Sequence, residues 1–420
     1  MEDHAITAPG NFSRLAPLMG TFHAFLNASE KGDLPPPAFI STSSASGIAA
    51  SIAVQRSEEK QVRAEEMIIN LKKKQFASLN PEIRNKGTLT VAATLAMLLP
   101  TQRIKEPYLR TVVTAGICGF AFWAQKEFIK DLFHVESFFR YDRLVKLLLT
   151  RKDILDFDLV FNSPTKIEIP AVNLNKTGWR LNEILADPPL YLGTRKSEGW
   201  VSVTNFRPED TNLANKEERN RRFAEGIVNG TRLPYFNPGR TDEGDYVVDT
   251  AFLSNLPIHF AINEGYSNIV IPYYNSSVEA PTDVAFTNWL QTLNRSLDIS
   301  VSAKTKKAIL GYLRVNNDLH YLNSQLEELK RLEEVANSEH LDNFSAGILA
   351  SYIRNTRTML RSLSYSHKKK INFVFIRSTP LPHVHFSEFT KDQMVEGINI
   401  GYTAGLDVVP EIAKMIKLKS

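Results

Sequence analysis

A serine-rich bend near the start of the chain is the first feature whose residues could do chemistry. Residues 40–48 read ISTSSASGI, where the apolar residues 38–40 are typical of a short strand and the small residues 47–53 are typical of a helix. A sharp turn from strand to helix exposes a serine hydroxyl and aims helix amides at it. The bend is therefore suited to nucleophilic attack by serine, although a helix-capping turn has the same composition.

A second feature lies about 200 residues downstream, where the apolar strand 246–249 ends in Asp249. Small residues follow it, then a turn at Gly265 and a further apolar strand at 269–271. An apolar strand that ends in an aspartate presents a carboxylate at the edge of a sheet, where α/β proteins place their sites. Asp249 is therefore a candidate partner for the serine bend.

At these two features the chain resembles the patatin-like phospholipases, which pair a serine in GxSxG with an aspartate in a DGG or DGA turn under a GGGxRG loop. ISTSSASGI is similar to the ISGTSxGG stretch of that family, and VVDTAFLSNLPI is similar to its aspartate turn and the asparagine–proline run beyond. Residues 10–15 and 18–20 are similar to the glycine-rich loop and the helix that follows it. Further similar segments, in the family's order, are 138–144, 163–167, 233–238 and 401–405.

The resemblance implies a role for each matched residue. Ser44 stands at the nucleophile position and Asp249 at that of the base, so the implied site is a Ser-Asp dyad without histidine. The backbone of Gly10, Asn11 and Phe12 stands where the family stabilises the oxyanion. Arg14 matches the basic residue of that loop, where it would hold the loop or attract a phosphate head group; a surface arginine is the alternative.

The match leaves two alternatives open. A register shifted by one residue makes Ser43 the nucleophile, because it fits the upstream apolar pair, although it fits the downstream glycine less well. The family's glycines are replaced by Asn11, Phe12, Thr42, Ser46 and Thr250, and glycine serves there because the backbone takes positive φ or approaches another segment. The implied function is a phospholipase A or lysophospholipase with no metal or organic cofactor. The alternative is a catalytically impaired protein that binds lipid or protein.

Composition agrees with a globular enzyme of one large domain. The 420 residues are 43% hydrophobic and carry a formal net charge of +4, so no nucleic-acid partner is indicated. The single cysteine, Cys118, excludes a disulfide framework and favours a reducing compartment. His383 and His385 share a face if their segment is extended, but no third ligand suits them, so we expect no metal site.

No secretory signal is evident in the first 20 residues. The uncharged runs 88–102 and 111–125 are shorter than the roughly 20 residues of a membrane span, so we expect them to pack over the core. An interfacial hairpin that inserts Phe120, Phe122 and Trp123 into lipid is the alternative. A cytoplasmic or peripheral membrane protein is therefore expected, acting on phospholipid or lysophospholipid at a membrane surface, with an activating protein partner as a further candidate.

The elements that must position these residues follow from hydrophobic periodicity. Strands are expected at 154–161, 166–174, 199–205 and 371–378, and helices at 211–229, across most of 282–363 and at 401–418. The leucines of 319–332 recur every three or four residues, which is typical of a helix packed on its own domain. The resemblance and these patterns predict a single domain over 1–420. Its fold is the patatin-like three-layer α/β/α sandwich, with helical insertions at about 60–149 and 282–363.

Overall fold

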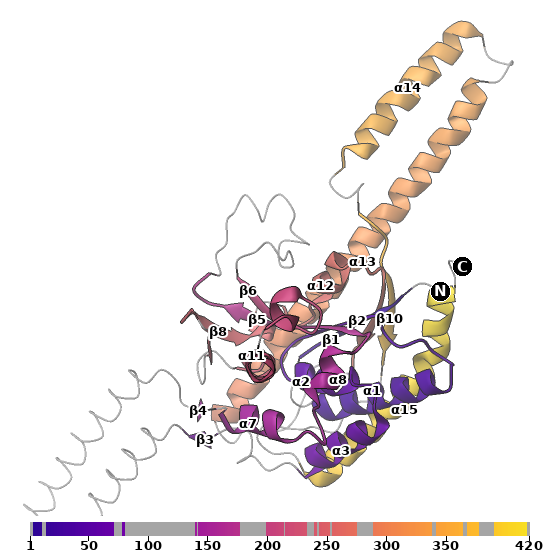
Figure 1. Cartoon of the computed structure of the whole chain (residues 1–420). Coiled ribbons are helices and arrows are strands. Elements are labelled where there is room, and N and C mark those ends of the chain that lie inside the picture. Colours follow the sequence, from indigo (N-terminus) through magenta and orange to yellow (C-terminus); the bar gives the residue numbers. More distant parts are fainter. Residues whose placement is uncertain are drawn as a thin grey trace, which may run out of the picture.

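The computed structural model has a central sheet with helices on both faces and a two-helix arm that projects from it (Figure 1). It describes residues 3–10, 14–70, 78–79, 139–140, 142–176, 199–213, 215–232, 239–241, 243–252, 254–274, 289–337, 342–363, 368–377 and 390–417.

The main sheet contains eight described strands in the order β10-β9-β1-β2-β5-β8-β7, and β6 also pairs with β5. The strands of this sheet are β1 (Ala5–Ala8), β2 (Phe39–Thr42), β5 (Lys166–Asn173), β6 (Trp200–Thr204), β7 (Gly239–Arg240), β8 (Tyr246–Asp249), β9 (Asn268–Pro272) and β10 (Asn372–Ile376). The five strands from β10 to β5 are parallel, whereas β6, β7 and β8 pair antiparallel to their neighbours. The parallel half brings the carboxyl ends of β1 and β2 to one edge, where sites of α/β proteins lie.

Strand β5 pairs with two different strands along one of its edges. Its first half pairs with β2, where Ser41 lies opposite Glu168, and its second half pairs with β8, where Asp249 lies opposite Ala171. Strand β6 pairs with both halves, from Glu168 to Val172. Because a strand has only two hydrogen-bonding edges, β2 and β8 share the edge that β6 leaves free. The carboxyl ends of β2 and β8 therefore meet end to end beside β5.

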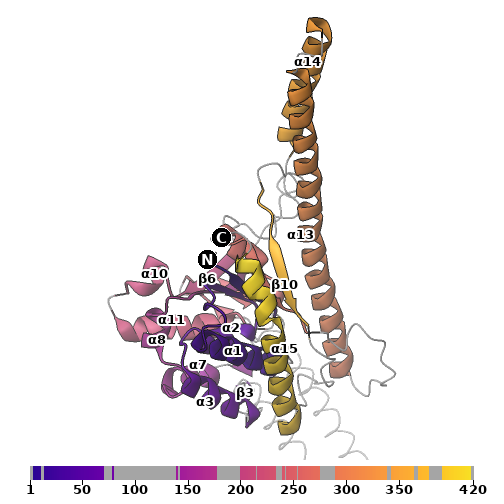
Figure 2. The same cartoon turned by 90° about the vertical axis from the view of Figure 1, so that its right-hand side faces the viewer.

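The structure describes eleven α-helices, most of which cover the two faces of this sheet. They are α1 (Leu15–Glu30), α2 (Ser46–Ala53), α3 (Glu58–Ile69), α7 (Asp142–Thr150), α8 (Phe157–Phe161), α10 (Pro208–Thr211), α11 (Lys216–Asn229), α12 (Ile258–Asn263), α13 (Trp289–Ala336), α14 (Asn343–Arg361) and α15 (Lys391–Lys417), with a short 3₁₀ turn η3 (Thr250–Phe252). Helices α1, α2, α3, α7, α8, α11 and α15 share a core with one face, and α12 and α13 pack on the other. Figure 2 shows α15 and α13 on opposite sides of β10.

Alternation along the strands divides the apolar residues between the two faces. In β2, Ile40 belongs to the core on the α1 side and Phe39 to the core on the α12 side. In β9, Val270 belongs to the α1 side, and Ile269 and Ile271 belong to the α12 side. Two helical layers around a mixed sheet confirm the predicted α/β/α class.

The backbones of helices α1 and α15 lie in direct contact, because glycines stand where the two helices meet. A Cβ on Gly401 would lie 1.8 Å from the carbonyl oxygen of Pro17, and one on Gly20 would lie 1.9 Å from that of Ile398. The Thr21 hydroxyl donates to the Gly401 carbonyl oxygen at 2.9 Å. This packing fixes the position of α1, which begins at Leu15, five residues after Gly10.

Replacement of Gly401 by alanine is expected to lower the free energy of unfolding by about 3 kcal/mol, because the new methyl group forces the two helices apart. Gly311 of α13 is the matched control, since a Cβ there meets nothing within 4 Å. Gly311→Ala is expected to stabilise the protein by about 0.5–1 kcal/mol through its helix propensity. Urea unfolding of both variants checks this, and equal stability of the two would contradict the backbone contact.

The arm consists of α13 and α14. With 48 residues, α13 extends over about 72 Å and continues beyond the sheet, as Figures 1 and 2 show. Leu319, Leu322 and Leu329 pack against Ile353 and Leu360 of α14. The predicted leucine stripe therefore packs within the chain, in its own hairpin. The division of residues 1–420 into one domain with two insertions stays a prediction.

Most of the predicted insertion at 60–149 lies outside the described residues, including the uncharged runs at 88–102 and 111–125. Its described parts are α3, α7 and the antiparallel pair of β3 (Ser78–Leu79) and β4 (Phe139–Arg140). In the described part of the chain, no helix combines the length and the apolar content that a bilayer crossing needs.

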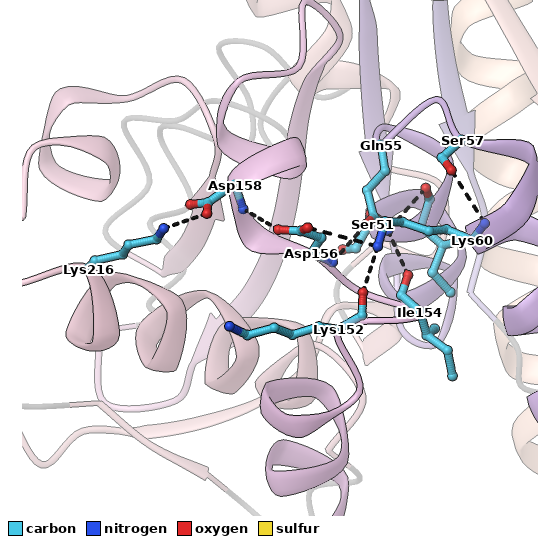
Figure 3. Close-up of polar contacts among 10 residues, drawn as sticks. Ser51, Gln55, Ser57, Lys60, Lys152, Ile154, Asp156, Asp158 and Lys216 are labelled. Atoms are coloured by element: carbon cyan, nitrogen blue, oxygen red, sulfur yellow. Dashed lines mark hydrogen bonds and ion pairs between the residues drawn. The ribbon is translucent and has the colours of Figure 1, made fainter.

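A polar network attaches the far end of α2 to the segment before β5 (Figure 3). The side chain of Gln55 donates to the Ile154 carbonyl oxygen at 2.9 Å and accepts from the Asp156 amide at 2.7 Å. Lys60 donates to the Lys152 carbonyl oxygen at 2.6 Å. The predicted strand at 154–161 is wrong, because Asp156 caps the amide of Asp158 and begins helix α8.

Candidate active site

The serine bend forms a strained turn between β2 and α2. Ser44 has φ of 57°, in the left-handed region that residues other than glycine rarely adopt. The Ser43 amide donates to the Ala8 carbonyl oxygen at 3.1 Å, so the chain stays beside β1 until the residue before the turn. Ser46 then begins α2. Backbone strain of this kind persists only where surrounding contacts hold it, and it is typical of functional sites.

Asp249 meets the serine at this turn. The Ser44 hydroxyl donates to the Asp249 Oδ2 atom at 2.5 Å, and the Ala251 amide donates to Oδ1 at 2.8 Å. The Asp249 amide donates to the Arg232 carbonyl oxygen at 2.7 Å. The two side chains, 205 residues apart in sequence, thus meet where the carboxyl ends of β2 and β8 face each other along β5.

The carboxyl group of Asp249 is buried, with 3% of the residue exposed. Burial raises the pKa of Asp249 to about 7, against the opposing effect of the hydrogen bonds from Ser44 and from the Ala251 amide. Near neutral pH the group therefore exchanges a proton readily, as a general base must.

Ser43 does not take part in this contact. It is fully buried, and its hydroxyl has no hydrogen-bond partner among the described residues. Of the two registers that the sequence left open, the one with Ser44 as the nucleophile is the one that brings a serine to the carboxylate.

The glycine-rich loop that the resemblance implies begins against the serine turn. A Cβ on Gly10 would lie 2.4 Å from the Ser44 Cβ atom, so only glycine fits there. The Gly10 amide donates to the Asn255 carbonyl oxygen at 3.3 Å, and the Asn255 side chain donates to the Thr305 hydroxyl of α13 at 2.8 Å. The amide of Gly10 thus has an acceptor within the protein, and the oxyanion role that the resemblance implies for Gly10 stays a prediction.

The other loop residues divide into two groups. Asn11 and Phe12 lie outside the described residues, so their implied role stays a prediction. Arg14 precedes the first residue of α1 and is 5% exposed, which excludes the surface alternative. Its role in holding the loop stays a prediction.

The residue after the nucleophile offers an amide that the sequence analysis missed. In serine hydrolases with a strand–turn–helix bend, the amide that follows the nucleophile commonly binds the oxyanion. Ala45 holds that position, and its amide has no acceptor among the described residues. The spacing of the bend alone would have suggested it.

No histidine bonds to the Asp249 carboxyl group among the described residues. His259, the histidine nearest in sequence after Asp249, packs its ring against Phe260 and Trp200 at centroid distances of 4.1 Å and 5.5 Å. His383 and His385 lie outside the described residues. Among the described residues, no group of three or more His, Cys, Asp and Glu side chains could hold a metal ion.

No protein-family model matches the chain, and no curated protein is significantly similar to it. Among solved structures, the crystal structure of VipD from Legionella pneumophila is similar over 98% of this chain and 67% of the VipD chain. The two share 13% sequence identity, and the TM-score is 0.35. The resemblance to patatin-like proteins therefore depends on the sequence motifs and on the contact between Ser44 and Asp249.

Proposed function

We propose that this protein is a serine acyl hydrolase that cleaves the ester bonds of phospholipids or lysophospholipids through a Ser44–Asp249 dyad. The observation that carries the proposal is the 2.5 Å hydrogen bond from the Ser44 hydroxyl to the Asp249 carboxyl group, at a serine with positive φ. The lipid substrate class comes from the patatin-like motifs around both residues.

The proposed reaction has two steps, and in each of them Asp249 accepts one proton and then gives it up. The Asp249 carboxylate accepts the hydroxyl proton of Ser44 while Oγ attacks the carbonyl carbon of the ester. The bond from that carbon to the alcohol oxygen then breaks, and the alcohol leaves with the proton from Asp249. In the second step water attacks the acyl carbon and Asp249 accepts a proton from the water. The bond from the acyl carbon to Oγ then breaks, Ser44 Oγ takes that proton, and the fatty acid departs.

The amide of Ala45 is our candidate for one oxyanion donor, and the backbone of Asn11 and Phe12 for the others. Loss of one such donor typically slows a hydrolase by about 100- to 1,000-fold. The substrate would be reached at a membrane surface, by a cytoplasmic or peripheral protein, with an activating protein as a further proposed partner.

The alternative, an impaired protein that binds lipid or protein, is favoured by one observation: the glycines of patatin-like motifs are replaced at positions 11, 12, 42, 46 and 250. Hydrolysis of phosphatidylcholine and lysophosphatidylcholine vesicles by the full chain separates the two functions. Release of fatty acid supports the hydrolase. Vesicle binding without any release of fatty acid or labelling of Ser44 supports the alternative.

The rate of hydrolysis is expected to rise with pH through a midpoint near 7. Asp249 accepts a proton only when it is ionised, and its pKa is raised to about 7, so the active form is lost as pH falls below that value. The profile of kcat/KM against pH, measured with a substrate that does not itself ionise, checks this. A rate that stays constant between about pH 5 and pH 9 would exclude Asp249 as the base.

A further inference from the structure

At three of the positions where this chain replaces the glycines of patatin-like motifs, the new residue carries a hydroxyl group. Thr42 and Thr250 are fully buried, and Ser46 is 2% exposed. A buried hydroxyl without a partner is costly, and each of these three has a backbone acceptor. The three hydroxyl groups therefore make hydrogen bonds that glycine cannot make.

Two of these hydrogen bonds attach the opposite ends of the dyad to the same strand. The Thr42 hydroxyl, at the end of β2, donates to the Glu168 carbonyl oxygen at 3.4 Å. The Thr250 hydroxyl, next to Asp249, donates to the Pro170 carbonyl oxygen. Carbonyl groups two residues apart in a strand point to the same edge, so both threonines bond to the edge of β5 that β2 and β8 share.

The sequence of β5 suits this arrangement. Backbone pairing with β2 ends at Glu168 and pairing with β8 begins at Ala171, so the edge between them lacks a ladder partner. Pro170 has no N–H group, and its position there leaves one donor fewer to satisfy. Each threonine hydroxyl adds a side-chain hydrogen bond to one of the two carbonyl groups that flank this gap.

The third hydroxyl holds the serine turn from the other side. Ser46 Oγ accepts from the Ser43 amide at 2.9 Å and lies 2.5 Å from the Ser43 carbonyl oxygen and 3.1 Å from that of Ala8. The turn is therefore bonded to β1 through Ser46 and to β5 through Thr42.

We infer that Thr42 and Thr250 are positioning residues, whose hydroxyl groups hold Ser44 and Asp249 at bonding distance by attaching β2 and η3 to the edge of β5. This inference rests on the proposed function, because it concerns the geometry of the same dyad. In this chain, replacing Thr42 or Thr250 with the glycine of the family is therefore expected to slow the reaction rather than to improve it.

The test uses valine, serine and glycine at positions 42 and 250 of the full chain. Valine keeps the shape of threonine but removes the donor, whereas serine keeps the donor. The rate at which a fluorophosphonate probe labels Ser44 is expected to fall on the order of 100-fold in Thr42→Val and Thr250→Val, because displacements of about 1 Å have such effects. The serine variants should retain most of the rate, and the glycine variants should be slower than the parent.

Thr165 provides the matched control. Its buried hydroxyl donates to the Pro37 carbonyl oxygen at 2.8 Å and so attaches the same two strands at their other ends, away from the dyad. Thr165→Val should lower the melting temperature as the other valine variants do, without slowing the labelling. This comparison separates a loss of positioning from a general loss of stability.

A second readout does not depend on activity. Because the hydrogen bond from Ser44 lowers the pKa of Asp249, a valine variant that separates the two residues should titrate Asp249 above the parent value of about 7. Carbon-detected NMR of the labelled aspartate measures this, and Thr165→Val should leave the value unchanged. The inference is overturned if the valine variants keep the parent's rate of Ser44 labelling and the parent's pKa of Asp249. It is also overturned if Ser44 is labelled faster in the glycine variants than in the parent. An unlabelled parent overturns the proposed function, and the titration then still decides the role of the threonines.

Discussion

Replacement of Ser44 by alanine is expected to reduce ester turnover on the order of 10⁴- to 10⁶-fold, the loss typical when a serine nucleophile is removed. The reason is chemical, since without Oγ no acyl-enzyme forms and only slow attack by water remains. Steady-state release of fatty acid from lysophospholipid measures the effect.

Ser43 is the matched control for this variant. It is adjacent in sequence, and its buried hydroxyl bonds to no described residue. Ser43→Ala should therefore turn over substrate at nearly the parent rate. Loss of turnover in Ser43→Ala with retention in Ser44→Ala would assign the nucleophile to the other register and contradict the site as described.

Replacement of Asp249 by asparagine is expected to abolish turnover and, at the same time, to stabilise the protein at alkaline pH. Burial raises the pKa of Asp249 from 3.8 to about 7. A group whose pKa is raised by folding contributes stability that is fully present below the unfolded value and is lost as pH rises through the folded value. The ionised carboxyl group therefore costs about 4 kcal/mol above pH 7, since one unit of pKa corresponds to about 1.4 kcal/mol.

Urea unfolding of both proteins across this pH window measures the prediction. The difference in unfolding free energy between Asp249→Asn and the parent should grow in favour of the variant as pH rises from about 4 to above 7. The asparagine side chain can still accept from the Ala251 amide and bond to Ser44, so the comparison isolates the charge. A difference that stays constant with pH would show that Asp249 is ionised without cost in the folded protein.

The sequence predicts this site where the determinants are local. The bend at Ser44 and the strand that ends in Asp249 each follow from about ten consecutive residues, and the α/β class follows from the resemblance together with the expected strands and helices. Segment 154–161 shows the limit of such patterns, because its apolar residues suit a strand but the side chain of Asp156 begins a helix.

The remaining determinants are long-range and were not predicted. The shared edge of β5 depends on which strands pair, and the contact of Asn255 with Gly10 depends on how two loops meet. The approach of Gly401 to Pro17 joins residues 384 positions apart, and no local pattern encodes it. The hydroxyl at position 250 suggested a loss of geometry in sequence, whereas its buried hydrogen bond to β5 is visible only in the fold.

Identification of the residue modified by a fluorophosphonate probe tests the central claim most directly. The folded full chain should gain one covalent adduct, peptide mapping should place it on Ser44, and the rate of its formation should rise through a midpoint near pH 7 as Asp249 ionises. An adduct on a different residue, or a folded protein that gains none at alkaline pH, would contradict the account of Ser44 as a nucleophile activated by Asp249.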